Sequence, residues 1–154
     1  MKKYFKIPKY KGAGIYGVVN IEDMKIYIGQ TTNVHNRAKQ HLQSLEHKSH
    51  HNTELQKDSD KSLRFLVLYE VPDSEIKYLK LLEKLYMLEA HEKGYKLYNI
   101  QGSTEVDELS KSIVNDALYY FNTNRNIENA ILKEYKSHTW NIKNMKYRHQ
   151  YFCG

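Results

Sequence analysis

The sequence predicts an α/β (α+β) fold, with a small three-stranded, mainly antiparallel sheet flanked by helices and followed by a helical C-terminal extension. Three observations lead to this prediction. Two β-type runs at residues 14–20 and 25–29 are separated by a four-residue connection, which is typical of a hairpin. Residues 34–45 repeat apolar side chains at helical spacing, and residues 63–69 form an almost continuous apolar run of strand length.

The predicted hairpin contains two related tripeptides, Gly-Ile-Tyr at residues 14–16 and Tyr-Ile-Gly at residues 27–29. Ten residues separate them. Each tripeptide lies within one of the two β-type runs, so the pattern places Tyr16 and Tyr27 on neighbouring strands. We expect the two tyrosines to face each other there.

A helix is predicted next, with Thr32 or Asn33 as its N-cap. At 100° per residue, Arg37 lies about 60° and His41 about 20° from Val34 on the helical wheel. Both polar side chains therefore lie at or beside the apolar stripe. A guanidinium in that position needs an anionic partner, from the protein or from a ligand.

The middle of the chain continues with a short helix at residues 52–58, and the strand at residues 63–69 is expected in the centre of the sheet. A helix is then predicted from about residue 75 to 92. Glu83 lies within its apolar arc, about 20° from Ile76 on the wheel. A carboxylate among apolar neighbours must be paired, protonated or bound to a metal. Its partner is either a cation such as Arg37 or a metal ion, and Glu89 and Glu92 lie off the arc.

Gly94 is expected to end that helix in a left-handed conformation. Further apolar residues at helical spacing predict a helix between residues 106 and 121 and another at 127–135. The preceding helix has a second apolar arc made of Leu81, Leu85 and Leu88. We expect the extension to pack on this arc, or the arc to form a dimer seam.

The chain of 154 residues carries 24 Lys and Arg against 18 acidic residues, a net charge of +6. This excess favours a polyanionic partner, without distinguishing nucleic acid from an acidic membrane surface. A single cysteine argues against a disulfide framework, and we found neither a membrane-spanning run nor a signal-peptide core. We expect a cytoplasmic protein that does not associate with membranes and is a monomer or a homodimer.

Three segments are expected: a basic N-terminal arm (1–12), a central domain (13–102), and a helical extension with a basic, aromatic tail (103–154). The arm interleaves lysines with aromatic residues, so it either packs on the sheet or contacts a nucleic-acid backbone. The tail aromatics either dock on the domain or stack on bases.

The two tripeptides, their spacing and the following helix with Arg37 and His41 resemble the GIY-YIG nuclease family, over about residues 13–101. The resemblance implies hydrolysis of phosphodiester bonds in DNA. It assigns catalytic roles to six residues, which are Tyr16, Tyr27, Arg37, His41, Glu83 and Asn99. It also implies that Glu83 binds one Mg²⁺ ion, for which Mn²⁺ could substitute, and that Tyr16 or His41 activates water.

His50 stands where many family members carry a polar site residue, and Asn52 follows it. Further candidates for contacts with DNA are the basic residues of the two ends, namely Lys9, Lys11, Lys143, Lys146 and Arg148. Three alternatives stay open: a structure-selective repair or recombination nuclease, a catalytically inactive nucleic-acid-binding module of the same fold, and a non-catalytic RNA-binding protein.

Overall fold

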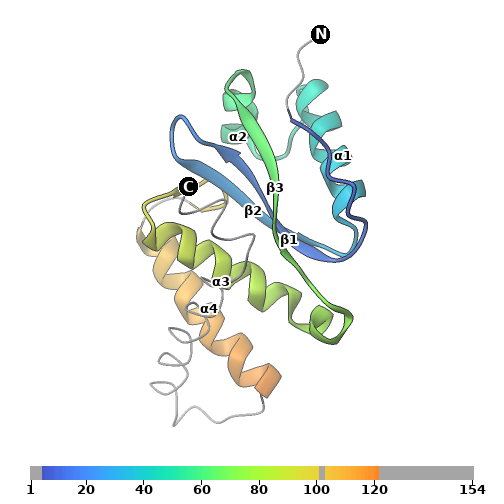
Figure 1. Cartoon of the computed structure of the whole chain (residues 1–154). Helices are drawn as coiled ribbons and strands as arrows, with labels where there is room; N and C mark the ends of the chain where they lie inside the picture. The colour runs from blue at the N-terminus through green and yellow to red at the C-terminus, as the bar shows by residue number, and fades with distance from the viewer. Residues whose placement is uncertain (1–4, 101–102, 122–154) are drawn as a thin grey trace.

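The computed structural model of the chain describes residues 5–100 and 103–121, which form a four-stranded sheet with helices on both faces (Figure 1). The predicted α+β fold class is therefore confirmed. The elements follow one another as β1 (Gly14–Asn20), β2 (Lys25–Thr31), α1 (Val34–Glu46), α2 (Thr53–Lys57), the 3₁₀ segment η1 (Asp58–Asp60), β3 (Leu63–Glu70), the 3₁₀ segment η2 (Asp73–Tyr78), α3 (Leu79–Glu92), β4 (Lys96–Leu97) and α4 (Ser103–Phe121).

The strand order is β3-β1-β2-β4, with antiparallel pairing except between β2 and the two-residue strand β4. The sequence predicts three strands, and the short parallel strand β4 is the fourth. The predicted central position of the strand at 63–69 was wrong, because β3 lies at the edge and β1 is central, with every residue buried. An edge strand can still be largely apolar when helices and the N-terminal arm cover it, as Phe5 covers Phe65 here.

Alternation along the strands divides the core into two layers. Ile15 and Val19 of β1 face the layer that contains α3, whereas Tyr16 and Val18 face the layer that contains α1 and α2. In β2, Ile26 and Ile28 continue the first layer. The period of two residues therefore directs Tyr16 toward α1.

The ends of helices α1 and α3 can be compared with the predicted ones. Asn33 is the N-cap of α1, because its side chain accepts a hydrogen bond from the Asn36 backbone N–H. The helix predicted from residue 75 starts as α-helix only at Leu79, since residues 73–78 form a 3₁₀ segment after Pro72. Ile76 is consequently 36% exposed and does not belong to the buried arc. Gly94 has φ +90°, as expected for the residue that ends α3.

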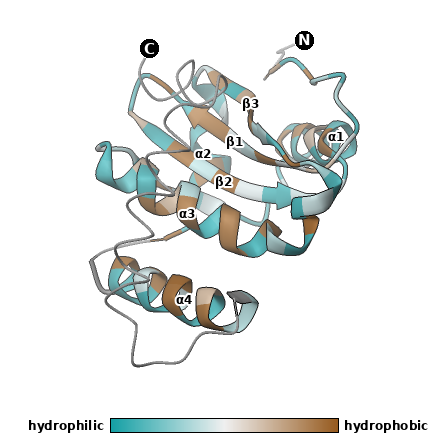
Figure 2. Ribbon diagram, turned by 60° about the horizontal axis from the view of Figure 1, so that its bottom comes forward, coloured by the Kyte–Doolittle hydropathy of each residue, from teal (hydrophilic) through white to brown (hydrophobic). Residues whose placement is uncertain are grey.

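The first helix of the extension, α4, packs against α3, which lies between α4 and the sheet (Figure 2). The apolar arc Leu81, Leu85 and Leu88 shares a core with Leu109 and Ile113 of α4, so the predicted docking is confirmed. Lys84 adds an ion pair with Asp116. The helix predicted at 127–135 and the basic tail lie outside the described residues. None of the described helices combines the length and the apolarity needed to cross a membrane.

Candidate active site

The candidate site is centred on the hydroxyl of Tyr16, a side chain that is 1% exposed. The Tyr16 hydroxyl oxygen accepts a hydrogen bond from Arg37 Nε at 3.1 Å and lies 2.8 Å from His41 Nε2. Arg37 and His41 are four residues apart in α1, so they project from the same side of the helix one turn apart. The Asn33 cap thus places both side chains over β1. A second contact, from Arg37 Nη1 to Gln40 Oε1 at 2.9 Å, fixes the guanidinium.

Tyr27 lies beside this centre on the same face of the sheet. The register pairs Tyr16 with Gly29 and Val18 with Tyr27, so the two tyrosines are diagonal neighbours. The expectation that they face each other directly was wrong. The Tyr27 ring packs edge-on against His41, with 5.4 Å between ring centroids. Its hydroxyl lies 3.1 Å from His51 Nε2. His51 is not among the predicted site residues, and its signal in the sequence is its adjacency to His50.

His50 lies behind His41 and does not face solvent. Its Nε2 is 2.8 Å from His41 Nδ1, and it is 6% exposed. The ring is buried and both of its nitrogens have partners in the protein. The contact of His50 with nucleic acid stays a prediction. The side chain of Asn52 also has partners within the protein. Its Oδ1 accepts from the Leu55 N–H and so caps α2, and its Nδ2 donates to the Tyr98 carbonyl. Asn52 thus has a structural role, and its contact with nucleic acid stays a prediction.

Glu83 lies on α3, the helix that packs on the other face of the sheet. The backbone of Gln30, near the end of β2, favours its ionised form, while the larger effect of burial raises the pKa of the carboxyl. The charge of Glu83 contributes to raising the pKa of both Tyr16 and Tyr27, so it acts on the same site. Among the described residues, Glu83 forms no ion pair with Arg37 or with another cation. The alternative of a salt bridge to Arg37 is thus not observed.

Glu83 fits a site for one hard divalent cation. Mg²⁺ is commonly held by one or two carboxylates while waters and substrate phosphates complete its coordination. Glu83 supplies a partly buried carboxylate without a cationic partner among the described residues. The described residues contain no group of three His, Cys, Asp or Glu that would hold a metal by themselves. A cation at Glu83 would therefore depend on the substrate for further ligands.

Asn99 lies shortly after β4 and binds the backbone of β2. Its Oδ1 accepts from the Ile28 N–H and its Nδ2 donates to the Ile28 carbonyl, both at 2.8 Å. The amide thus extends the contact between β2 and the chain after β4. Because Ile28 separates Tyr27 from Gly29, Asn99 fixes the strand that carries one wall of the site.

The electrostatics of the cluster differ from those of free side chains. Burial raises the pKa of Tyr16 and Tyr27, with the Arg37 cation acting against the rise. Burial and the nearby Arg37 lower the pKa of His41 to about 3, and burial and His51 lower that of His50 to about 4. Both histidines are accordingly neutral at pH 7.

The predicted basic contacts divide into two groups. Lys9 and Lys11 are exposed on the arm, which is docked through Phe5 and through a hydrogen bond between His35 and the Pro8 carbonyl. Packing of the arm on the domain is therefore observed, and its two lysines stay accessible. The other predicted contacts, Lys143, Lys146 and Arg148, lie outside the described residues.

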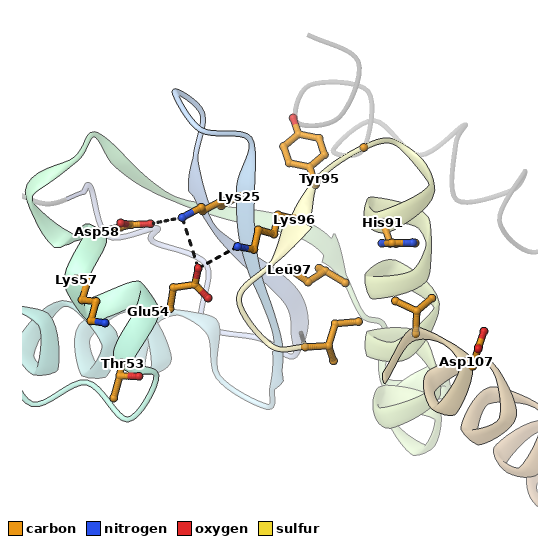
Figure 3. A pocket seen from close by; sticks show the side chains of 13 residues that line it. Lys25, Thr53, Glu54, Lys57, Asp58, His91, Tyr95, Lys96, Leu97 and Asp107 are labelled. Atoms are coloured by element: carbon orange, nitrogen blue, oxygen red, sulfur yellow. Dashed lines mark hydrogen bonds and ion pairs between the residues drawn. The ribbon is translucent and has the colours of Figure 1, made fainter. Parts of the chain in front are cut away.

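A cleft of about 1050 Å³ lies at the start of β2 and does not include the tyrosine cluster (Figure 3). Its charged side chains bind one another: Lys25 contacts both Asp58 and Glu54, and Glu54 also contacts Lys96. The cleft therefore presents mostly neutralised charge. The chemistry of the molecule is concentrated around Tyr16.

The chain is similar to known proteins in sequence and in structure. The family model described as the GIY-YIG catalytic domain matches residues 12–99. One solved structure, titled "Structure of the Catalytic Domain of Homing Endonuclease I-TevI", is similar to the chain at 25% sequence identity and a TM-score of 0.48. The match covers 55% of this chain and 94% of that one. No curated protein sequence matches the chain.

Proposed function

Because the chain belongs to the GIY-YIG catalytic-domain family, we propose that it is a metal-dependent DNA endonuclease that uses Mg²⁺, with Mn²⁺ as a substitute. Family membership supports a nuclease domain with DNA as substrate. The choice of metal and the roles of individual residues are our proposal. The observation that supports it most is the junction of three groups at one oxygen, where Arg37 and His41 both hydrogen-bond to Tyr16.

We assign Arg37 to the negative charge of the phosphate. Hydrolysis concentrates charge on the non-bridging oxygens of the phosphate, and a guanidinium remains charged at any working pH. Arg37 hydrogen-bonds to Tyr16, Gln40 and Tyr27 within the protein. A guanidinium has five N–H donors, so N–H groups remain for a phosphate oxygen. A divalent cation held by Glu83 would supply Lewis-acid polarisation of the phosphate and of the leaving oxygen.

We assign Tyr16, and not His41, to the attacking water. The low pKa of His41 makes its imidazole a weak base, and both ring nitrogens already have protein partners. Because burial raises the pKa of Tyr16, it can act as the base only as phenolate, after its proton has passed to solvent water. The phenolate then takes a proton from the attacking water, the water oxygen bonds to phosphorus, and the bond to the 3′ oxygen breaks, with the leaving oxygen taking a proton from solvent. Tyr27 orients water or phosphate through its hydroxyl.

Sequencing the ends of DNA treated with the full chain tests the proposal. Supercoiled plasmid is incubated with Mg²⁺, with Mn²⁺ or with chelator, using wild type, Arg37→Ala and Glu83→Ala. We expect ends with 5′-phosphate that need the metal and are lost in both variants. Glu46→Gln, at an exposed position of α1, serves as the matched control and should cleave like wild type.

Other outcomes would favour the alternatives. Binding of DNA without cleavage under any metal condition would indicate a catalytically inactive module. Faster cleavage of synthetic junctions than of plasmid would indicate a structure-selective repair or recombination nuclease. Binding of RNA that is unaffected by changes at Glu83 would indicate an RNA-binding protein.

A further inference from the structure

Three successive hydrogen bonds connect the backbone of Asn52 to the hydroxyl of Tyr16. The Asn52 N–H donates to His50 Nδ1 at 3.0 Å. His50 Nε2 lies 2.8 Å from His41 Nδ1, and His41 Nε2 lies 2.8 Å from the Tyr16 hydroxyl oxygen. His41 is 2% and His50 is 6% exposed, so solvent has little access to these hydrogen bonds.

The direction of each bond follows from the first donor. A backbone N–H can only donate, so His50 Nδ1 carries a lone pair, and a neutral His50 must carry its proton on Nε2. That proton is donated to His41 Nδ1. A neutral His41 then carries its own proton on Nε2 and donates it to Tyr16. Both imidazoles are neutral at pH 7, because burial, the main cause, lowers the pKa of each well below that value.

We propose that His50, held by the backbone of Asn52, is a positioning residue that keeps His41 in the Nε2–H tautomer and makes it a donor to Tyr16. The Tyr16 oxygen then receives two hydrogen bonds, one from His41 and one from Arg37 Nε. Its own proton must point away from both donors. The catalytic part of this inference rests on the proposed nuclease function, whereas the tautomer itself does not.

This arrangement has a chemical consequence for the reaction. His41 in the Nε2–H form has no lone pair directed at Tyr16, so it cannot remove the proton of the phenol. The two donors instead stabilise negative charge on the Tyr16 oxygen, in the manner of an oxyanion hole. A His41 with its proton on Nδ1 would set two N–H groups against each other at the His50 contact, or at the Asn52 contact if His50 changed its tautomer as well. Holding a catalytic histidine in the wrong tautomer can cost several powers of ten in rate.

The direct test is long-range ¹H–¹⁵N correlation spectroscopy on the ¹⁵N-labelled full chain at pH 7, which reports the protonated nitrogen of each imidazole. We expect His41 to be protonated at Nε2. His50→Gln keeps an N–H donor for His41 Nδ1 and should preserve this tautomer. His50→Glu offers only an acceptor and should transfer the His41 proton to Nδ1. His47→Gln, at an exposed position, is the matched control.

Kinetics provide the second measurement. We expect kcat for plasmid cleavage to fall less than about 10-fold in His50→Gln and about 10²-fold or more in His50→Glu, with KM little changed. Protonation of His41 at Nδ1 in wild type would overturn the inference, as would equal losses in the two variants. If His50→Glu does not fold, the wild-type and His50→Gln spectra still decide. An Nε2–H tautomer in a chain that cleaves nothing would support the positioning role and overturn the nuclease proposal.

Discussion

The ring of Tyr16 lies directly over the backbone of Gly29, its partner in the β1–β2 register. A Cβ at position 29 would approach the Tyr16 hydroxyl oxygen and two ring atoms closer than 3.0 Å, which real Cβ atoms essentially never do. Gly29 thus provides the space in which the phenol meets Arg37 and His41. The first tripeptide supplies the phenol and the second supplies its space.

Gly29→Ala should therefore displace the Tyr16 hydroxyl while the sheet remains folded. The loss of both hydrogen bonds at that oxygen should lower kcat about 10²-fold or more, since one preorganised donor is typically worth roughly 10²–10³-fold. The measurement is single-turnover plasmid nicking, with circular dichroism to verify folding. Gly17→Ala is the matched control, because its Cβ would meet the flexible Ile26 side chain on the opposite face. Equal activity of Gly29→Ala and wild type would contradict this role.

Glu83→Gln should abolish metal-dependent cleavage without unfolding the chain. The substitution removes the carboxylate charge but keeps the shape, and Lewis-acid stabilisation worth several kcal/mol corresponds to roughly 10³-fold in rate. Because burial raises the pKa of this carboxyl, its charge is costly in the folded state. The free energy of unfolding should accordingly stay constant or rise.

Titration with Mg²⁺ and urea unfolding measure the two effects of Glu83→Gln. Glu46→Gln, which is exposed on α1, should alter neither. A strongly destabilised Glu83→Gln protein with normal cleavage rates would mean that the carboxylate has a structural role.

Much of the site could be predicted from the sequence because it depends on local spacing. The strand pair, the Asn33-capped helix and the separation of Arg37 and His41 each follow from short-range periodicity. The edge position of β3 and the start of α3 at Leu79 depend on how distant elements pack, which periodicity does not encode. The role of His50 was missed for the same reason. It requires the loop after α1 to bring His50 back against His41, nine positions earlier.

Acidification should destabilise the protein before its carboxylates titrate. Folding lowers the pKa of His41 to about 3 and of His50 to about 4, mainly through burial, whereas an unfolded histidine titrates near 6.5. Below about pH 6.5 the unfolded chain therefore binds two protons that the folded chain does not. Stability is full above this pH and falls as the pH decreases, by up to about 1.4 kcal/mol per pH unit for each imidazole.

Urea unfolding between pH 7.5 and 5 measures this slope. His50→Gln should reduce this slope by the amount that corresponds to the uptake of about one proton on unfolding. The exposed control His47→Gln should reduce the slope less. Comparing slopes between variants cancels the contribution of other groups, including Glu83, whose pKa burial raises. An unchanged slope in His50→Gln would show that His50 is not held neutral by the fold.

Asn99→Asp should weaken the fold and the site together. The wild-type amide donates to the Ile28 carbonyl and accepts from its N–H, whereas a carboxylate can only accept and would repel that carbonyl. The expected loss is about 1–3 kcal/mol in the free energy of unfolding, the usual cost of an unsatisfied buried group. Cleavage should also slow, because Ile28 lies between Tyr27 and Gly29.

The pH dependence of the stability distinguishes loss of the hydrogen bond to the Ile28 carbonyl from a nonspecific destabilisation of the fold. Once protonated, the carboxyl introduced by Asn99→Asp regains a donor for the Ile28 carbonyl, so the difference in stability from wild type at the same pH should shrink as the pH falls toward 4. Asn36→Asp, at an exposed position of α1, is the matched control and should change stability by less than about 0.5 kcal/mol. If the Asn99→Asp penalty were independent of pH, the paired hydrogen bonds to Ile28 would not be its cause.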